Sequence, residues 1–267
     1  MKPDFQLSVI DYLNTTTNCD TYHNILITAL KNKTVLKQMT INQFASACFV
    51  SAPTITRVAH HFGCQSFPEF KASITSFGEN MELSQFHISK SNYNKLKHEP
   101  ATFIETYTEQ ITSALHDLSQ NIDLKQIDCF LARLQQCENI FIFSYSTSYF
   151  NASLFQNDLL LSNKLCICPH TLAQQAEIAQ ELGKNDIAIV LTCYGNYLNH
   201  ASELMKSIAR SDAYSVLVTQ NPVMVNATLF DEVLAFTQHN HIEAGPYIMS
   251  YGMEYLGRRY HALFHSD

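Results

Sequence analysis

Short apolar segments alternate with longer helical patterns throughout the second half of the chain. The apolar segments, rich in β-branched and aromatic residues, span residues 139–146, 165–168, 186–192, 214–220 and 231–236. Helical patterns lie between them, for example at residues 172–182 and 197–210. Buried strands of roughly four to eight residues that alternate with helices of about ten or more predict βαβ units. We therefore expect an α/β domain in which helices flank both faces of a mainly parallel sheet.

The first third of the chain shows helical spacing only. The pattern predicts a short helix after Thr40, a turn at residues 48–50 and a second helix after Ser51. Pro53 falls in the first turn of the second helix, where its missing N–H does little harm, and Gly63 ends that helix. The apolar residues that share one face of the second helix are Ile55, Val58, Ala59 and Phe62. An all-α domain containing two helices joined by a tight turn is expected.

Two short helices with such a turn are what a DNA-reading helix-turn-helix requires. Arg57 faces away from the apolar side, where it can reach a guanine edge or a phosphate, and Thr54 lies close enough to touch the DNA backbone. The residues expected to contact DNA are Thr40, Ser51, Pro53, Thr54, Thr56, Arg57, His60 and His61. A plain helical hairpin with a solvated polar face is the alternative interpretation.

The formal net charge of the chain is −7, which bears on DNA binding. Residues 1–78 carry six Lys or Arg against four Asp or Glu, whereas the rest of the chain carries 11 against 20. A local positive excess can contact phosphates while an acidic remainder limits non-specific binding. Double-stranded DNA is therefore not excluded as a partner. Because the excess is small, useful affinity is expected to need a homodimer or homotetramer.

The segment MTINQFASACFVSAPTITRVAHHFGCQSFPEFKASI, residues 39–74, resembles the N-terminal domain of the RpiR family of bacterial transcriptional regulators. The resemblance implies a helix-turn-helix that binds a DNA operator. Phe49 departs from the family pattern, because the turn usually has glycine at this position. A residue other than glycine with a positive φ there costs on the order of 1 kcal/mol.

Polar clusters follow several of the predicted strands. In parallel sheets, ligands bind beyond the carboxyl ends of strands, near helix N-termini that favour anions. One cluster follows the first predicted strand, at residues 144–148, and another follows the strand at residues 186–192, at residues 192–196. A third cluster, at residues 219–222, follows a later strand. The residues expected to bind a ligand are Ser144, Ser146, Thr147, Ser148, Thr192, Tyr194, Gly195 and Asn196. The alternative is that these side chains only cap helices and form turns.

The first two clusters resemble those of the sugar isomerase (SIS) domain, the usual effector-binding half of RpiR regulators, which has a three-layer αβα fold and binds phosphosugars. Ser148 keeps the serine of the first family loop, but Ser144 and Ser146 replace its two glycines. In the second loop Thr192 keeps a hydroxyl, whereas Tyr194 replaces a serine and fills volume. The resemblance implies a phosphorylated sugar as the effector. A ligand without phosphate, or a site reduced to dimerisation, remain alternatives.

The resemblance implies a DNA-binding domain at residues 1–78, a linker at 79–100 and an SIS-like domain with lead-in helices at 101–267. With 267 residues and 46% hydrophobic content, the chain can bury two cores. The linker segment has little apolar periodicity and ends in proline. No signal peptide and no apolar run of about 18 residues is present, so a cytoplasmic protein without a membrane partner is expected.

Metal, cofactor and catalytic signals are weak. His239 and His241 offer two imidazoles, but no Cys, Asp or Glu at metal-ligand spacing accompanies them, so a loop and no metal site is predicted. The eight cysteines form no CxxC pair, and no GxGxxG or Walker loop is present, so no cofactor is expected. An isomerase would need a base such as His170, Glu177 or Glu181, whose geometry nothing fixes. We expect no enzymatic activity.

Overall fold

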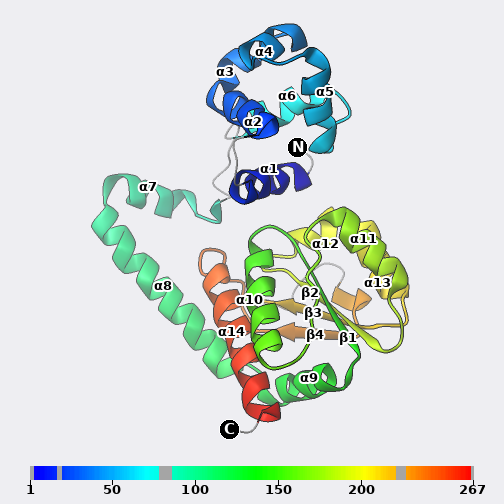
Figure 1. Ribbon diagram of the computed structural model, residues 1–267. Coiled ribbons are helices and arrows are strands. Elements are labelled where there is room, and N and C mark those ends of the chain that lie inside the picture. The colour runs from blue at the N-terminus through cyan, green and yellow to red at the C-terminus, as the bar shows by residue number, and fades with distance from the viewer. Residues whose placement is uncertain (1–2, 17–19, 78–85, 221–226, 266–267) are drawn as a thin grey trace. The chain divides into compact units, whose positions relative to one another are not determined.

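The computed structural model describes residues 3–16, 20–77, 86–220 and 227–265 (Figure 1). The chain divides into two compact units, Met1–Glu82 and Leu83–Asp267. The expected domain boundary at residue 78 lies outside the described residues. The end of the polar cluster at residues 219–222 lies outside them too.

The first unit is all-α, as the sequence predicts. Its helices are α1 (Pro3–Thr15), α2 (Thr21–Lys31), α3 (Lys33–Leu36), α4 (Ile41–Ala47), α5 (Ala52–His61) and α6 (Phe67–Ser76). Aromatic residues fill the centre of this unit: Phe5 of α1 meets Phe62 and Phe70 edge-on, with ring centroids 6.3 and 5.9 Å apart. The four apolar residues predicted to face inward from α5 and its C-cap are all buried.

The second unit is built around a four-stranded parallel sheet in the order β1-β2-β3-β4. The strands are β1 (Asn139–Ser144), β2 (Asp186–Leu191), β3 (Tyr214–Thr219) and β4 (Glu232–Ala235). The helices are α7 (Lys90–His98), α8 (Pro100–Asn121), α9 (Leu124–Gln136), α10 (Thr147–Leu161), α11 (Leu172–Glu181), α12 (Asn196–His200), α13 (Ser202–Arg210) and α14 (Gly245–Phe264). None of the described helices, in either unit, is both long and apolar enough to span a membrane.

Both faces of the sheet are covered, which confirms the predicted three-layer αβα fold (Figure 1). Along β2, Ile187 and Ile189 point into a core shared with α9, α10 and α14. Ala188 and Val190 point into a second core formed with α11 and α13. Alternate residues of one strand thus enter two cores, which is why the strand reads as a continuous apolar run.

Two predicted elements differ from the structure. Residues 165–168 do not form a strand: Ile167 makes a single bridge beside β1, donating to the Ile140 carbonyl at 2.8 Å and accepting from the Ile142 amide at 2.9 Å. Pairing stops there because Pro169 follows and has no N–H to donate. The helix expected at residues 197–210 is interrupted at Ala201, which separates α12 from α13.

Part of the segment expected to be a linker, residues 79–100, forms the helix α7. The Ser89 side chain caps this helix by accepting from the Asn92 amide at 3.1 Å. The Glu243 carboxylate, which precedes α14, accepts from the Ser89 amide at 2.8 Å and from the Asn92 side chain at 2.7 Å. These partners lie about 150 positions apart along the chain, so local periodicity could not reveal an ordered helix here.

Candidate functional site

The turn between α4 and α5 begins and ends at the predicted residues. The Thr40 side chain accepts from the Gln43 amide at 3.3 Å, and the Gln43 side chain accepts from the Thr40 amide at 2.8 Å. This reciprocal pair is a capping box, which satisfies two free donors at the start of α4. Ser51 is the N-cap of α5 and Pro53 lies in its first turn, as predicted.

Phe49 has the positive φ predicted for this departure from glycine, at 56°. Its amide donates to the Ser46 carbonyl at 3.1 Å, and the Val50 amide donates to the Ala45 carbonyl at 3.0 Å. This is the Schellman pattern, in which the residue after the C-cap is usually glycine. The Phe49 side chain is 96% exposed, so no packing of the ring within the unit explains the strained backbone.

Three of the predicted DNA contacts form a row on the outer face of α5. The Ser51 and Thr54 hydroxyls lie 2.9 Å apart, and Arg57 Nη2 donates to the Thr54 hydroxyl at 3.3 Å. Ser51, Arg57 and the neighbouring Pro53 are exposed. Arg57 is the one Arg or Lys in the sequence of α5, so this row presents a guanidinium beside two hydroxyls.

The other predicted contacts of α5 have partners within the unit. The His61 ring packs edge-on against Tyr12 of α1 and Tyr22 of α2, with centroids 5.4 and 5.3 Å apart. His60 Nε2 lies 3.2 Å from the Gln65 carbonyl oxygen. The Thr56 hydroxyl bonds back to the preceding turn of its own helix. His60 and His61 are nonetheless exposed, whereas Thr56 is half-buried.

In the second unit, a cavity of about 240 Å³ lies beyond the carboxyl ends of β1 and β2, which are neighbours in the sheet. Six of the eight predicted ligand residues line it: Ser146, Thr147, Ser148, Thr192, Tyr194 and Asn196. They come from the loop and first turn of α10 and from the loop that leads into α12. The two polar clusters, far apart in sequence, thus surround one space.

The remaining two predicted residues lie behind the cavity wall. Ser144 ends β1 with 1% of its surface exposed, and its hydroxyl is buried without a hydrogen-bond partner. Gly195 donates its amide to the Thr192 hydroxyl at 3.2 Å and has a φ of 77°, which glycine adopts freely. Both residues shape the loops, and neither lines the cavity.

Ser146 holds a backbone conformation that belongs to glycine. Its φ is 56° and its ψ is −128°, immediately before α10. Such a conformation costs a residue with a Cβ on the order of 1–3 kcal/mol. The loop therefore keeps the backbone path that the family's glycine allows, although this chain has serine at that position.

Tyr194 is anchored at the mouth of the cavity. Its hydroxyl donates to the Ile242 carbonyl at 2.5 Å, and its ring stacks on His87 with centroids 3.9 Å apart. Burial raises the pKa of the Tyr194 hydroxyl and lowers the pKa of the His87 imidazole, so both are held in their neutral forms. An aromatic pair thus lines the cavity where the family pattern has a small hydroxyl.

Five lining residues were not among the predicted ligand residues: His87, Tyr145, Cys193, Tyr197 and His200. Tyr145 and Cys193 lie inside the two polar clusters, so their sequence positions could have identified them as lining residues. The Tyr197 hydroxyl donates to the side chain of Gln175, whose amide also holds the Ser144 carbonyl at 2.9 Å. His87 belongs to the segment expected to be a linker, and nothing local marks it.

The residues weighed as isomerase bases do not enter this cavity. Glu177 and Glu181 are exposed on α11, and His170 packs against Tyr149 at 4.5 Å. None of the described lining residues is Asp or Glu. The structure therefore brings hydroxyls, amides and aromatic rings together here, without a carboxylate that could move a proton.

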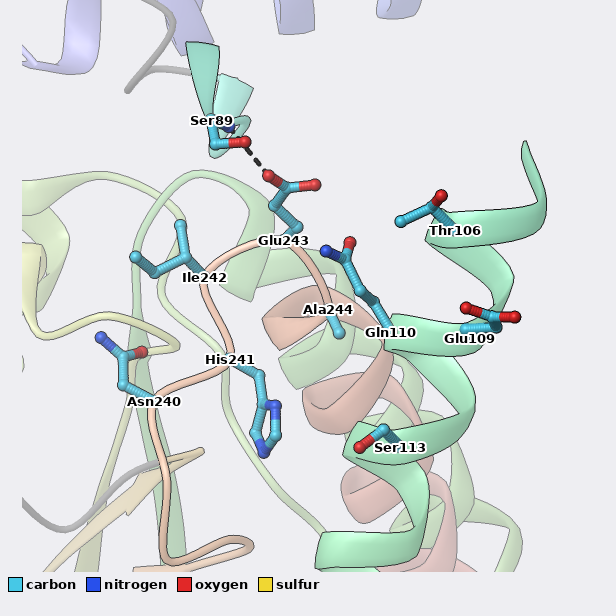
Figure 2. Close-up of a pocket in the computed structure, with 10 residues that line it drawn as sticks. All are labelled: Ser89, Thr106, Glu109, Gln110, Ser113, Asn240, His241, Ile242, Glu243 and Ala244. Carbon is cyan, nitrogen blue, oxygen red and sulfur yellow. Dashed lines mark hydrogen bonds between the residues drawn. The ribbon is translucent and has the colours of Figure 1, made fainter. Parts of the chain in front are cut away.

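A larger cavity, of about 540 Å³, lies along α8 (Figure 2). One face of α8 forms one wall, and the loop before α14 forms the other. Its lining residues are Ser89, Thr106, Glu109, Gln110, Ser113, Asn240, His241, Ile242, Glu243 and Ala244. Of these, only His241 was noted in the sequence, for its imidazole.

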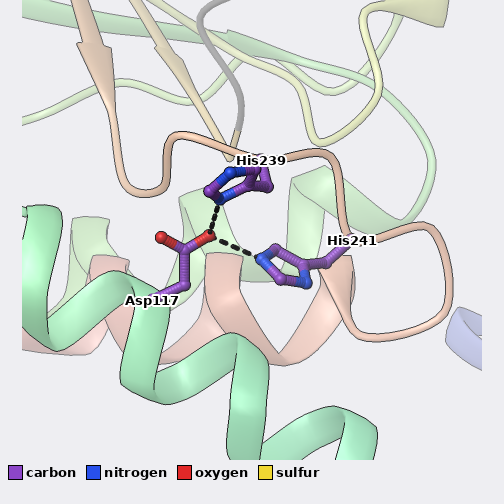
Figure 3. Close-up of side chains that lie close together, drawn as sticks. All are labelled: Asp117, His239 and His241. Carbon is purple, nitrogen blue, oxygen red and sulfur yellow. Dashed lines mark hydrogen bonds and ion pairs between the residues drawn. The ribbon is translucent and has the colours of Figure 1, made fainter.

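At residues 239–241 the sequence predicts a plain loop, because no set of Cys, Asp or Glu at metal-ligand spacing accompanies the two histidines. The structure supplies one from 122 positions before His239 (Figure 3). Asp117 Oδ2 of α8 lies 3.1 Å from His239 Nδ1 and 2.7 Å from His241 Nε2. Residues 239–241 form a loop, as predicted, and tertiary packing places a carboxylate between the two imidazoles, which the sequence did not reveal.

Residues 20–77 match the model of the rpiR-family helix-turn-helix domain. No curated protein sequence matches the chain. Among solved structures, the Vibrio vulnificus NanR protein complexed with ManNAc-6P is similar over 97% of this chain and 92% of its own, with 14% identity and a TM-score of 0.55. A candidate sugar-phosphate isomerase from Listeria monocytogenes is similar over 61% of this chain and 90% of its own, with 13% identity and a TM-score of 0.51.

At these identities the structural matches establish the fold of the second unit and nothing more about it. The sequence match covers α2 to α6, including the turn with Phe49 and the outer face of α5. Residues 20–77 are therefore a helix-turn-helix domain of the rpiR family, which this chain joins to a unit with the SIS-like αβα fold.

Proposed function

We propose that this chain is a DNA-binding transcription regulator, and that a small metabolite bound beyond β1 and β2 controls its affinity for DNA. The observation that carries the proposal is the convergence of six predicted ligand residues around one cavity. The same chain contains an rpiR-family helix-turn-helix domain. A ligand changes DNA affinity only if it binds the DNA-competent and incompetent states differently. As a regulator of bacterial transcription, the chain would act in the cytoplasm.

A phosphorylated sugar is the effector class that we propose. The hydroxyls of Thr147, Ser148 and Thr192 line the cavity at the N-terminus of α10, a 15-residue helix whose dipole favours an anion there. NanR, which has a similar fold, is complexed with ManNAc-6P. The Tyr194 and His87 rings favour the alternative of a ligand without phosphate, since they occupy part of the wall that small hydroxyls would otherwise form.

We propose no enzymatic role for the cavity. Aldose–ketose isomerisation needs a base beside the carbonyl carbon, usually a carboxylate or an imidazole. The described lining residues include the imidazoles of His87 and His200 but no carboxylate. Burial lowers the pKa of His87, which makes its imidazole a weaker base, and stacking on Tyr194 holds the ring at the cavity wall. Turnover of sugar phosphates, followed by NMR, would overturn this part of the proposal.

A dimer is the expected functional form, because two recognition helices then meet half-sites about 34–36 Å apart. Exposed apolar side chains on and just after α10 provide a surface for it: Phe150, Leu154, Leu160, Leu161 and Leu165, each at least 60% exposed. Large apolar side chains exposed close together in this way mark association surfaces. The inner face of α14 is not available, because Ile248, Met253 and Tyr260 are buried in the core.

The proposal is tested in two separate steps. Repeated selection from random duplex DNA should yield a preferred operator sequence. If no sequence is enriched at low salt, the proposal of a DNA-binding regulator is contradicted. The melting temperature and operator affinity are then measured with a panel of sugar phosphates and with the matching sugars that lack phosphate. At least one sugar phosphate should raise the melting temperature and change operator affinity fivefold or more. A response to an unphosphorylated sugar alone would favour the alternative ligand class.

A further inference from the structure

The cluster of Asp117, His239 and His241 lies in the second unit, outside the cavity of the proposed effector site (Figure 3). One carboxylate oxygen, Asp117 Oδ2, lies between two imidazole nitrogens from the loop after β4. The three potential ligand atoms lie within 4.8 Å of one another. Tetrahedral zinc with bonds of about 2.0–2.1 Å needs ligand atoms about 3.3 Å apart, so small side-chain rotations would suffice.

Buried Gln220 fixes the loop that carries the imidazoles. Its side chain accepts from the His241 amide at 3.3 Å and donates to the Asn240 side chain at 3.1 Å. Its carbonyl also accepts the Thr237 amide at 2.8 Å. Gln220 itself is 0% exposed, so both ends of the histidine loop are tied to the sheet. The backbone that carries the two imidazoles is therefore held in place before any ligand arrives.

The carboxylate is also positioned. The Asn121 side chain donates to Asp117 Oδ1 at 2.6 Å and to the Asp117 carbonyl at 3.0 Å. Oδ1 is thereby occupied, and Oδ2 is left to face the imidazoles. Outer contacts that orient a ligand in this way are characteristic of metal sites, and their loss weakens binding about 10- to 100-fold.

The site has a sheltered side and an open side. The Asp117 side chain is 10% exposed and the His241 side chain 21%, whereas that of His239 is 75% exposed. Gln110 and Ser113 of α8 line the larger cavity, and His241 belongs to its opposite wall (Figure 2). Asp117 follows Ser113 by four residues, which places it on the same face of α8. An ion held here would keep a coordination position open to water or to a molecule in that cavity.

We propose that Asp117, His239 and His241 bind a divalent transition-metal ion of the Zn²⁺ class. Two imidazole nitrogens and one carboxylate oxygen suit zinc and its neighbours in the first transition series, whereas Mg²⁺ and Ca²⁺ prefer oxygen ligands only. Three protein ligands with an open position match zinc sites that exchange a water or bind a ligand atom. The rival interpretation is an ion pair in which Asp117 only holds protonated imidazoles.

The test is calorimetric titration of the untagged full chain with Zn²⁺, compared with single variants. We expect one equivalent bound through this cluster, and at least tenfold weaker binding in both His239→Ala and His241→Ala. His116→Ala is the matched control, because this exposed imidazole precedes Asp117 on the same helix and lies outside the cluster. Asn121→Ala should weaken binding about tenfold while leaving all three ligands present.

Cysteine thiolates are also zinc ligands, and the chain has cysteines outside the cluster, so bound Co²⁺ provides a second measurement. Cobalt in the Asp117 cluster should show visible absorption without the intense near-ultraviolet band of a thiolate ligand. His239 is largely exposed, so His239→Ala should fold normally, which circular dichroism can check. No binding by the unmutated chain, or binding unchanged in His239→Ala and His241→Ala, would overturn the metal site and support the ion-pair interpretation. Neither result bears on the effector cavity.

Discussion

Phe49 and Gly63 hold the same left-handed backbone conformation, each one residue beyond the C-cap of consecutive helices, with φ of 56° and 71°. The bonding matches as well: the Cys64 amide donates to the Ala59 carbonyl, as the Val50 amide does to that of Ala45. Two Schellman motifs thus frame α5, one with the favoured glycine and one with phenylalanine. The helix-turn-helix geometry is kept although one of its turns is strained.

Phe49→Gly should stabilise the chain by about 1 kcal/mol, because it removes the positive-φ strain while the lost ring was 96% exposed. Urea unfolding of the full chain measures the change. Gly63→Ala is the matched reverse change: nothing lies within 4 Å of the added Cβ, so strain alone should destabilise the chain by about 1 kcal/mol. Equal stability of Phe49→Gly and the unmutated chain would mean that the turn relaxes without cost.

The parts of the fold that follow local rules could be predicted from sequence. The inward face of α5 repeats every three to four residues, and the cap at Thr40 uses a neighbour three positions away, so both were visible. Polar residues just after β1 and β2 were found for the same reason. Parallel neighbouring strands bring their carboxyl ends together, so sequence position alone placed six residues at one cavity.

The features that could not be predicted depend on contacts between distant segments. Asp117 meets His241 across 124 positions, and Glu243 orders the start of α7 across 154. His87 reaches Tyr194 from a polar segment that has no apolar periodicity. At Ile167 the sequence predicts too much structure: its apolar neighbours predict a strand, but only one bridge forms. Contacts between distant segments decide the first three of these cases, whereas Pro169 limits the pairing of Ile167.

Arg57→Ala should weaken operator binding about 5- to 150-fold with folding intact, the range for losing one good base contact at 1–3 kcal/mol. The reason is that the Arg57 side chain is exposed and donates to the Thr54 hydroxyl of its own helix, beside which it can reach DNA. Fluorescence anisotropy with the selected operator at fixed salt measures the loss. Lys31→Ala removes the same charge from an exposed position at the end of α2 and should have a smaller effect. Equal losses of operator affinity in the two variants would mean that Arg57 contributes only its positive charge and makes no specific base contact.

Ser148→Ala and Thr192→Ala should each reduce the rise in melting temperature caused by the effector. Both side chains line the cavity and are nearly buried, at 6% and 4% exposed, so a lost hydroxyl would leave a ligand oxygen unpaired at a cost of about 1–3 kcal/mol. Ser153→Ala, on the same helix as Ser148 but outside the cavity lining, is the control and should respond like the unmutated chain. An undiminished response in both cavity variants would place the effector elsewhere.

Tyr194→Ser should distinguish the two ligand classes. The substitution restores a small hydroxyl at the position where the Tyr194 ring lines the cavity and stacks on His87. If the effector carries a phosphate that contacts this loop, its affinity should rise several-fold, since space and a donor become available. If the effector stacks on the aromatic pair, its affinity should fall instead. Calorimetric titration with the effector found in the panel gives the sign.

Leu154→Glu should split the proposed dimer. Leu154 lies on the outer face of α10 and is 62% exposed, between Phe150 and Leu161, which are 68% and 72% exposed. A two-fold axis at this face would bring the helix against its own copy, so a single substitution places two carboxylates at the interface. Sedimentation velocity should then show monomers at concentrations where the unmutated chain is dimeric.

Loss of the dimer in Leu154→Glu should also lower operator affinity. Each recognition helix would then bind its half-site alone, without the gain in affinity from linked binding. Val35→Glu is the control, since it introduces the same charge at an exposed apolar residue of α3, in the other unit. That variant should sediment like the unmutated chain. If the Leu154→Glu protein stays dimeric, the dimer interface does not involve this face of α10. Tight operator binding by a monomeric Leu154→Glu protein would instead show that one helix-turn-helix suffices, against the small positive excess of residues 1–78.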